Sequence, residues 1–368
     1  MRSAAGVTLI LRCLAVICAS SAYGGADDPE VRRQAVLQEE SCGVTGGCAT
    51  TAEAPCDDDG LDVASCPAPT DYVCEHELPG LSVCESPPLS AMLPCWMSSI
   101  DGTLTLSEIS IPGTHNTMAK GSTACHQDGQ ANLVHTQTWS LRTMLDAGVR
   151  ALDIRLRHVN DAFTLEHGII ELPYTFDEDV RDVLATFLAD NPTETVVMFY
   201  QIHERDSSNT RTPEESLQAS LDDLPDLWIT GSTVPTLDDA RGKVILPNDM
   251  PSEEQNEFDL TFDIIGEKKT LIREFFLESG PKAGVFRLNY FSGASLALYP
   301  LTVAGGLRHF YRGTNEVLFE FADGFLGVTM FDFIGEDAVA HVVAQQGATA
   351  PSWTDPSEAT GSGTTGSP

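Results

Sequence analysis

The sequence lacks three features that would each point to a class of function. Beyond its first residues it has no apolar run long enough to cross a bilayer, and it has no glycine-rich loop of the kind that cradles nucleotide phosphates. Basic residues are few, with 21 Lys and Arg against 54 Asp and Glu. The resulting net charge of −33 at pH 7 argues against a nucleic-acid partner and against binding to an anionic membrane by charge alone.

The start of the chain has the pattern of a secretory signal. Arg2 and Arg12 flank the beginning, and an apolar stretch over 13–22 ends in small residues suited to cleavage. We therefore predict a signal peptide over 1–22, a flexible segment over 23–41 and a secreted, extracellular protein. An uncleaved tail is the alternative for the same residues.

Cysteines are concentrated in one short segment that is poor in apolar residues. Without the predicted signal peptide, eight of the ten cysteines remain, an even number that an oxidising compartment favours. We expect a disulfide-stapled module over 42–95, with Cys125 as the candidate partner of an unpaired seventh cysteine. A zinc site is less favoured, because closely spaced Cys-x-x-Cys pairs are missing. The seven cysteines of the module are Cys42, Cys48, Cys56, Cys66, Cys74, Cys84 and Cys95.

Residues 96–345 alternate between strand-like and helix-like stretches, and 42% of the whole chain is hydrophobic, enough for a large core. This alternation predicts an α/β fold, an irregular (β/α)8 barrel of the TIM type. An open doubly wound sheet is the competing architecture, without a nucleotide loop to support it. Residues 346–368, rich in Gly, Ser, Thr and Pro, predict a disordered tail. The expected strands are 150–157, 163–167, 195–201, 243–246, 285–290 and 326–333, and the expected helices are 175–191, 267–278 and 306–319.

Chemically active side chains lie at the ends of the first predicted strands. His115 follows an Ile-rich strand and a Pro-Gly turn, which would put its ring at the mouth of a barrel. Asp153 and Arg155 are two apart on a strand and point to one face, where a guanidinium can bind phosphate oxygens. His167 ends the next strand, so two histidines on neighbouring strand ends can serve as a base and an acid. A helix-capping histidine and a structural ion pair are the alternatives.

The local sequences around these residues resemble the catalytic X domain of phosphatidylinositol-specific phospholipase C in its bacterial, single-domain form. The resemblance covers 96 to about 338 and is carried by 109–117, 148–155, 165–168 and 327–333. It implies a phosphoric diester hydrolase that cleaves phosphatidylinositol to diacylglycerol and cyclic inositol phosphate.

The resemblance also implies a role for each residue of the candidate catalytic set. His115 is the expected base, and Asp332 orients its ring. Arg155, assisted by Asn116, stabilises charge on the phosphate. His167 is the expected acid, positioned by Asp153.

Three positions depart from the bacterial pattern or define the substrate pocket. Asn116 stands where bacterial members have Asp, and Gln201 stands where they have Lys; Gln201 and Tyr290 are the expected substrate-binding residues. Arg155 occupies the place of an acidic metal ligand of the calcium-dependent members. We therefore expect no metal and no other cofactor, since Asn116 and Asp153 alone would bind calcium poorly.

The expected partner is a phosphoinositide or related phospholipid at a membrane interface, with no nucleic acid, and the protein is expected to be a monomer. Two alternatives remain open. One is another phosphodiesterase of the same barrel type, glycerophosphodiesterase-like or sphingomyelinase D-like, which uses a metal held by several acids. The other is a surface-binding protein that acts through the cysteine-rich module and has a degenerate barrel.

Overall fold

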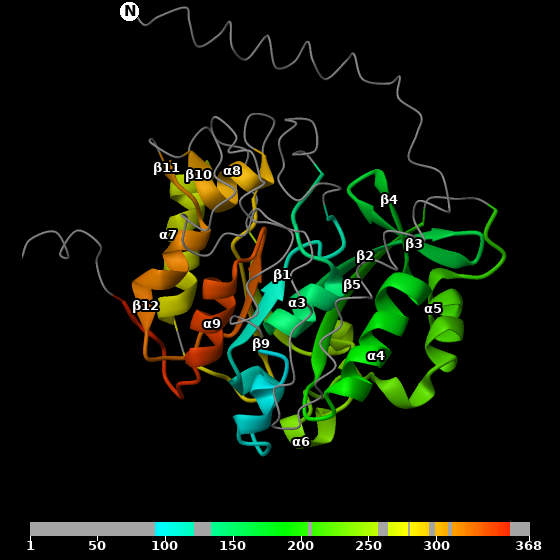
Figure 1. Cartoon of the computed structure of the whole chain (residues 1–368), viewed down its shortest axis with the longest axis horizontal. Coiled ribbons are helices and arrows are strands. Elements are labelled where there is room, and N and C mark those ends of the chain that lie inside the picture. The colour runs from blue at the N-terminus through cyan, green and yellow to red at the C-terminus, as the bar shows by residue number, and fades with distance from the viewer. Residues whose placement is uncertain are drawn as a thin grey trace, which may run out of the picture. The chain divides into compact units, whose positions relative to one another are not determined.

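The computed structural model (Figure 1) describes residues 93–120, 134–204, 208–256, 264–278, 280–293, 299–307 and 311–353. All of them belong to one structural unit, Val63–Pro368. The predicted signal peptide, the flexible segment and every cysteine except Cys95 lie outside the described residues. Cys95 is disulfide-bonded, and the cysteine-rich module remains a prediction.

A curved, mostly parallel sheet forms the centre of the described part (Figure 1). Its strand order is β6-β7-β5-β2-β1-β13-β9-β8, and every neighbouring pair along this path is parallel. β3 and β4 extend β2 as an antiparallel hairpin. In the described ranges no ladder joins β6 to β8, so the barrel is open at that side. The strands of this sheet are β1 Ile111–Thr114, β2 Ala151–Val159, β3 Ala162–His167, β4 Ile170–Thr175, β5 Val196–Glu204, β6 Trp228–Ile229, β7 Val244–Ile245, β8 Ser252–Gln255, β9 Phe286–Tyr290 and β13 Val328–Phe331.

Helices connect the strands and cover the outer face of the sheet (Figure 1). α3 shows the local rules well, because the Ser140 hydroxyl accepts a hydrogen bond from the Thr143 N–H at its start and Gly148, with φ 115°, ends it. α5 begins with a reciprocal cap between Thr212 and Glu215. The helices are α3 Leu141–Ala147, α4 Asp182–Asp190, α5 Pro213–Asp222, α6 Leu237–Ala240, α7 Ile264–Glu278, α8 Pro300–Gly305 and α9 Glu336–Ala344.

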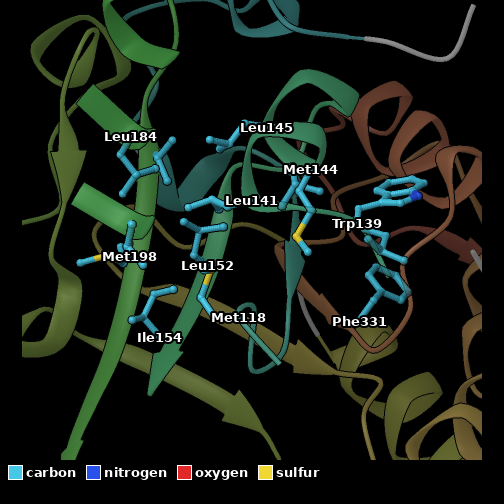
Figure 2. Close-up of a cluster of buried hydrophobic side chains, with 14 of the residues drawn as sticks. Met118, Trp139, Leu141, Met144, Leu145, Leu152, Ile154, Leu184, Met198 and Phe331 are labelled. Atoms are coloured by element: carbon cyan, nitrogen blue, oxygen red, sulfur yellow. The ribbon is translucent and has the colours of Figure 1, made fainter. Parts of the chain in front are cut away.

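Alternation along the strands separates two apolar clusters. On β2, Ala151 faces the barrel interior, whereas Leu152 and Ile154 pack outward against α3 and α4 (Figure 2). Met198 on β5 faces outward in the same way. Side chains two residues apart share a face, so the face that begins with Ala151 continues toward the carboxyl ends of the strands with Asp153 and Arg155. The interior face is therefore apolar at the bottom of the barrel and polar at its mouth.

The predicted α/β barrel is confirmed, with the expected strands found as β2, β3, β5, β7, β9 and β13 and two expected helices found as α4 and α7. The prediction of a Pro-Gly turn before His115 is wrong, because Pro112 and Gly113 lie within β1. Gly113 is needed there for space: a Cβ would lie 2.6 Å from the Met330 sulfur and 2.8 Å from the Ala151 Cβ. Glycine thus lets β1 pack closely between its neighbours.

Two further predictions are wrong at the C-terminal side. The helix expected over 306–319 is replaced by α8, the short strands β10 Gly306–Leu307 and β11 Tyr311–Arg312, and a 3-10 turn over Asn315–Glu320. Gly306 adopts φ 86°, which ends α8 at that point. Residues 346–353 of the predicted tail are instead part of the fold, because β14 Ser352–Trp353 pairs with β12 Phe321–Ala322. The rest of the predicted tail lies outside the described residues.

A buried ion pair closes the end of the barrel opposite the mouth. Arg150 and Glu194 are both fully buried, and the guanidinium Nε and Nη2 donate to one carboxylate oxygen at 3.0 and 2.9 Å. Nη1 donates to the carbonyls of Leu145 and Val149, and Nη2 also donates to that of Pro94. Burial lowers the pKa of Arg150, and the charge of Glu194 offsets part of this effect.

Glu194→Gln should lower the free energy of unfolding by about 3–5 kcal/mol, because it leaves a buried guanidinium without its counter-charge. Urea denaturation at pH 7 measures the loss. Asp190→Asn is the matched control, since Asp190 is an exposed partner of Arg142 and its pair contributes at most about 1 kcal/mol. Equal losses of unfolding free energy in the two variants would contradict the idea that the buried Arg150–Glu194 pair contributes more to stability than an exposed pair.

Candidate active site

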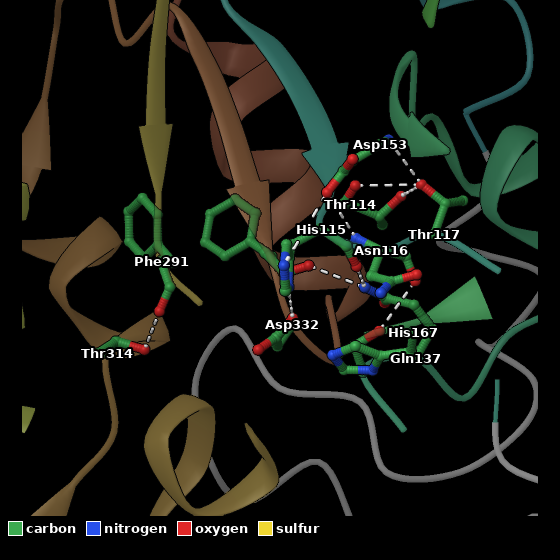
Figure 3. A network of polar contacts seen from close by, with 12 residues as sticks. Thr114, His115, Asn116, Thr117, Gln137, Asp153, His167, Phe291, Thr314 and Asp332 are labelled. Atoms are coloured by element: carbon green, nitrogen blue, oxygen red, sulfur yellow. Dashed lines mark hydrogen bonds and ion pairs between the residues drawn. The ribbon is translucent and has the colours of Figure 1, made fainter. Parts of the chain in front are cut away.

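Polar side chains from separate strands meet on the interior face at the mouth of the barrel (Figure 3). His115 continues the inward face of β1, Asp153 and Arg155 lie on β2, and Asp332 follows β13. Parallel strands bring their carboxyl ends to one edge, which explains why residues distant in the sequence meet here. The predicted residues that gather at this edge are His115, Asn116, Asp153, Arg155, His167, Gln201, Tyr290 and Asp332.

His115 lies between two buried carboxylates. Its Nδ1 is 2.7 Å from Oδ1 of Asp332, and its Nε2 is 4.0 Å from Oδ2 of Asp153. With Nδ1–H donating to Asp332, Nε2 is left as the basic nitrogen that faces the mouth. Only 13% of the His115 side chain is exposed, so its ring is held in one orientation while one edge stays reachable.

Asp153 connects the loop after β1 to the guanidinium on its own strand. Its oxygens accept from Nε and Nη2 of Arg155, both at 2.7 Å, and from the backbone N–H of Asn116 at 3.1 Å. Burial alone would raise the pKa of Asp153, but the charge and hydrogen bonds of Arg155, together with His115 and the Asn116 N–H, lower it. The carboxylate is therefore ionised throughout the neutral range.

Arg155 is the principal cation of the site. Its Nη1 also donates to Oε1 of Gln201 at 2.9 Å, and Arg155 and Gln201 are paired across β2 and β5. Burial would lower the pKa of Arg155, but the charge and hydrogen bonds of Asp153, together with Tyr290 and Asp332, outweigh burial and raise it. The guanidinium of Arg155 is held by Asp153 and Gln201, and its remaining N–H groups are available to bind phosphate oxygens.

His167 lies at the mouth, but not on a strand that neighbours β1, as we had expected. β3 is antiparallel to β2, and β2 separates it from β1, so the two histidines do not lie on neighbouring strand ends. Their ring centroids are nevertheless 6.3 Å apart at a right angle. The hairpin turns β3 back toward the mouth and places His167 opposite His115.

The positioning of His167 by Asp153 is also wrong, because Asp153 is occupied by Arg155 and the loop after β1. Nδ1 of His167 instead makes a short hydrogen bond with the backbone carbonyl of Val134. Burial lowers the pKa of His167, the charges of His115 and Arg155 lower it further, and the Val134 carbonyl and Asp332 oppose the shift. A histidine with a lowered pKa is the stronger proton donor once it is protonated.

Asn116 has a left-handed backbone with φ 39°, a conformation that Asn and Asp tolerate better than most residues. Besides the bond to Asp153, its carbonyl accepts from the Thr136 hydroxyl at 2.9 Å. Its side chain is buried, with 2% of the residue exposed. Asn116 therefore shapes the loop that carries His115.

Tyr290 is the last residue of β9 and is buried beside His115, and its expected contact with substrate stays a prediction. Its ring meets that of His115 edge to face, with centroids 6.1 Å apart, and 5% of the residue is exposed. Burial raises the pKa of Tyr290, with the charge of Asp153 adding to the effect, so the hydroxyl stays protonated. The tyrosine ring therefore packs against the imidazole of His115 and limits its movement.

Supporting residues that the sequence did not single out hold the loop after β1. The Gln137 amide donates to the carbonyls of His115 and Phe331, both at 2.9 Å. The Thr117 hydroxyl donates to the Thr114 carbonyl and accepts from the Asp153 N–H. Nothing in the local sequence distinguishes these side chains from ordinary loop residues, because most of their partners are backbone groups distant in the sequence.

Residues 109–249 match the family model described as phosphatidylinositol-specific phospholipase C, X domain. Residues 109–249 are an X domain of this family. The chain is 33% identical over 157 residues to a 1-phosphatidylinositol phosphodiesterase of Listeria monocytogenes, a match that covers 41% of this chain and 47% of that protein. It is 32% identical over 161 residues to the protein of that name from Staphylococcus aureus, covering 42% and 50%. The chain thus spans about half the length of the curated relatives it matches.

Solved structures confirm the fold around the X domain. A phosphatidylinositol-specific phospholipase C from Staphylococcus aureus superposes with a TM-score of 0.57 at 20% identity, covering 70% of this chain and 99% of that chain. The enzyme of that name from Listeria monocytogenes gives a TM-score of 0.51 at 22% identity, covering 68% and 98%. The structural similarity therefore extends well beyond 109–249.

The lowered pKa of Asp153 predicts a pH-dependent contribution to stability. A carboxylate whose folded-state pKa is below its unfolded value stabilises the fold above the unfolded value, and the contribution is lost as pH falls through the folded value. The difference in unfolding free energy between the wild type and Asp153→Asn should be constant from pH 5 to 8 and should shrink below about pH 4. Urea titrations across this range measure it. A difference that grows on acidification would contradict the ionised assignment.

Proposed function

We propose that this chain is a secreted, metal-independent phosphodiesterase that cleaves phosphatidylinositol to diacylglycerol and cyclic inositol phosphate. The observation that carries the proposal is the pair of histidine rings 6.3 Å apart at the mouth that also holds a guanidinium, with His115 bonded to Asp332 and Arg155 bonded to Asp153. The relatives named 1-phosphatidylinositol phosphodiesterase support the substrate class.

The chemistry would proceed by transfer of one proton at each histidine. Nε2 of His115 takes the proton of the inositol 2-hydroxyl, and Asp332 stabilises the imidazolium that forms. The deprotonated oxygen attacks phosphorus and closes the cyclic phosphate. The bond from phosphorus to the glycerol oxygen breaks, and His167 supplies the proton that completes diacylglycerol.

Arg155 would stabilise the negative charge that builds up on phosphorus oxygens during this exchange. It is anchored on two sides, by Asp153 and Gln201, so its geometry is set before the substrate binds. The anionic phosphate would also raise the fraction of protonated His167, because an adjacent negative charge favours the imidazolium. The acid would thus be charged when the substrate is in place.

The same proposal covers the partner and the location of the protein. The proposed partner is a phosphoinositide-type lipid at a membrane interface, and the proposed protein is an extracellular monomer. Within the described residues, no helix is long and apolar enough to span a bilayer. In the same residues, no three His, Cys, Asp or Glu side chains are arranged to hold a metal ion.

The full chain should release cyclic inositol phosphate from vesicles that contain phosphatidylinositol, and the rate should be the same with and without chelator. His115→Ala and His167→Ala should each reduce turnover at least 100-fold while the folded structure is retained, since each removes one proton-transfer group. His341→Gln on α9 is the control for loss of a histidine outside the site. Activity that disappears in chelator and returns with calcium would contradict the metal-independent mechanism.

Asn116→Asp tests the sharpest departure from the bacterial pattern. A carboxylate at this position, near His167 and Arg155, should raise the pKa of the acid and move the alkaline limb of the pH–rate profile upward. Since Asp tolerates the left-handed backbone nearly as well as Asn, the variant should remain folded. An unchanged alkaline limb in a folded variant would restrict Asn116 to its structural role.

A further inference from the structure

A buried carboxylate directly precedes the proposed catalytic acid. Glu166 and His167 are the last two residues of β3. The Glu166 side chain is fully buried, and a buried carboxylate is stable only when cations or hydrogen bonds compensate for its lost hydration. None of the proposed proton transfers uses Glu166. Its burial at this position therefore points to a task other than chemistry on the substrate.

The Glu166 carboxylate meets basic side chains from two other strands. Its Oε1 is 2.6 Å from Nδ1 of His203 on β5, and its Oε2 is 3.7 Å from Nη1 of Arg157 on β2. Arg157 and His203 are themselves paired across the β2–β5 ladder. Glu166 thus links the β3–β4 hairpin to two parallel strands of the barrel at once.

The ladder between β3 and β2 ends before the strand reaches these two residues. The pairing runs from Ala162 to Leu165, so Glu166 and His167 lie beyond its last residue and pair with β4 instead. Successive residues of a strand point to opposite faces. Glu166 can therefore fix the end of β3 from one face while His167 projects from the other toward His115.

The position of His167 matters because proton transfer requires contact with the leaving oxygen. A misplacement of about 1 Å in a catalytic group can cost roughly 100-fold in rate. The contact of His167 with the Val134 carbonyl fixes the ring, but it does not attach β3 to the sheet. Resting on the proposed function, we propose that Glu166 is a positioning residue, which ties the end of β3 to β2 and β5 so that His167 reaches the leaving oxygen.

Glu166→Gln in the full chain tests this, because it keeps the size of the side chain and removes its charge. With phosphatidylinositol vesicles, kcat should fall about 10- to 100-fold, whereas KM should change little, because Arg155 and its hydrogen bonds are untouched. Glu171→Gln is the matched control. Glu171 on β4 is 52% exposed, so its contact with Arg157 at 3.7 Å is weakened by solvent and its loss should leave kcat close to that of the wild type.

The pKa of His167 gives a second measurement that does not depend on turnover. Burial is the main cause that lowers this pKa, so a hairpin end that moves away from the mouth should expose the ring and raise the pKa in Glu166→Gln. Loss of a nearby negative charge without any movement would lower the same pKa instead. NMR titration of the ring, assigned by its absence in His167→Ala, distinguishes the two results.

The remaining outcomes contradict the positioning role or support it. A wild-type kcat in the folded Glu166→Gln variant, an unchanged or lowered pKa of His167, or an equal loss of kcat in Glu171→Gln would overturn it. Should Glu166→Gln fail to fold, His203→Gln removes the same contact from its exposed side and should change kcat and the His167 pKa in the same directions. No cleavage by the wild-type chain would overturn the proposed function alone, since the titration of His167 still reports on its position.

Discussion

The buried carboxylate of Asp153 is the contact on which the site depends. It accepts two hydrogen bonds from Arg155 and one from the backbone of Asn116, and it lies 4.0 Å from the Nε2 of His115. One charged group therefore fixes the guanidinium, the loop after β1 and the electrostatic surroundings of the imidazole together. A buried carboxylate is stable only when it is paired in this way, so the cation and the loop are required by the fold as well as by the chemistry.

The site also shows how a guanidinium can be held in place within a strongly acidic chain. The net charge of −33 is distributed over the whole sequence, and its field is screened by salt within about 10 Å. At the mouth, the guanidinium of Arg155 is paired with the carboxylate of Asp153, so its capacity to bind phosphate lies in its remaining N–H groups rather than in a net positive charge. The phosphodiester of the proposed reaction would thus be bound by short-range hydrogen bonds, although the protein as a whole repels an anion.

The hairpin of β3 and β4 departs from a regular barrel in a way that serves the site. A parallel barrel supplies side chains only from strand ends on the inner face, and the hairpin adds one from outside this set. It brings His167 back toward His115. A second irregularity is that, within the described residues, no strand pairing joins β6 to β8.

Local sequence alone determined the alternation of strands and helices, the pairing of Asp153 with Arg155 on one face, and the family through its motifs. These features follow from periodicity and spacing over a few residues. The errors have the same origin. Pro112 and Gly113 have the local sequence of a turn, but the packing of β1 against Met330 places them in a strand. The stretch 306–319 has the local pattern of a helix, but α8 ends at Gly306.

Only the tertiary structure decided which groups hold the two histidines. Asp332 lies 217 residues after His115 yet bonds to it, a pairing that the family resemblance implied and residue spacing could not supply. The Val134 carbonyl, rather than Asp153, contacts His167, and the Gln137 amide ties the ends of β1 and β13 together. Backbone groups carry no residue-specific signal in a sequence, so contacts made through them become visible only when the chain has folded.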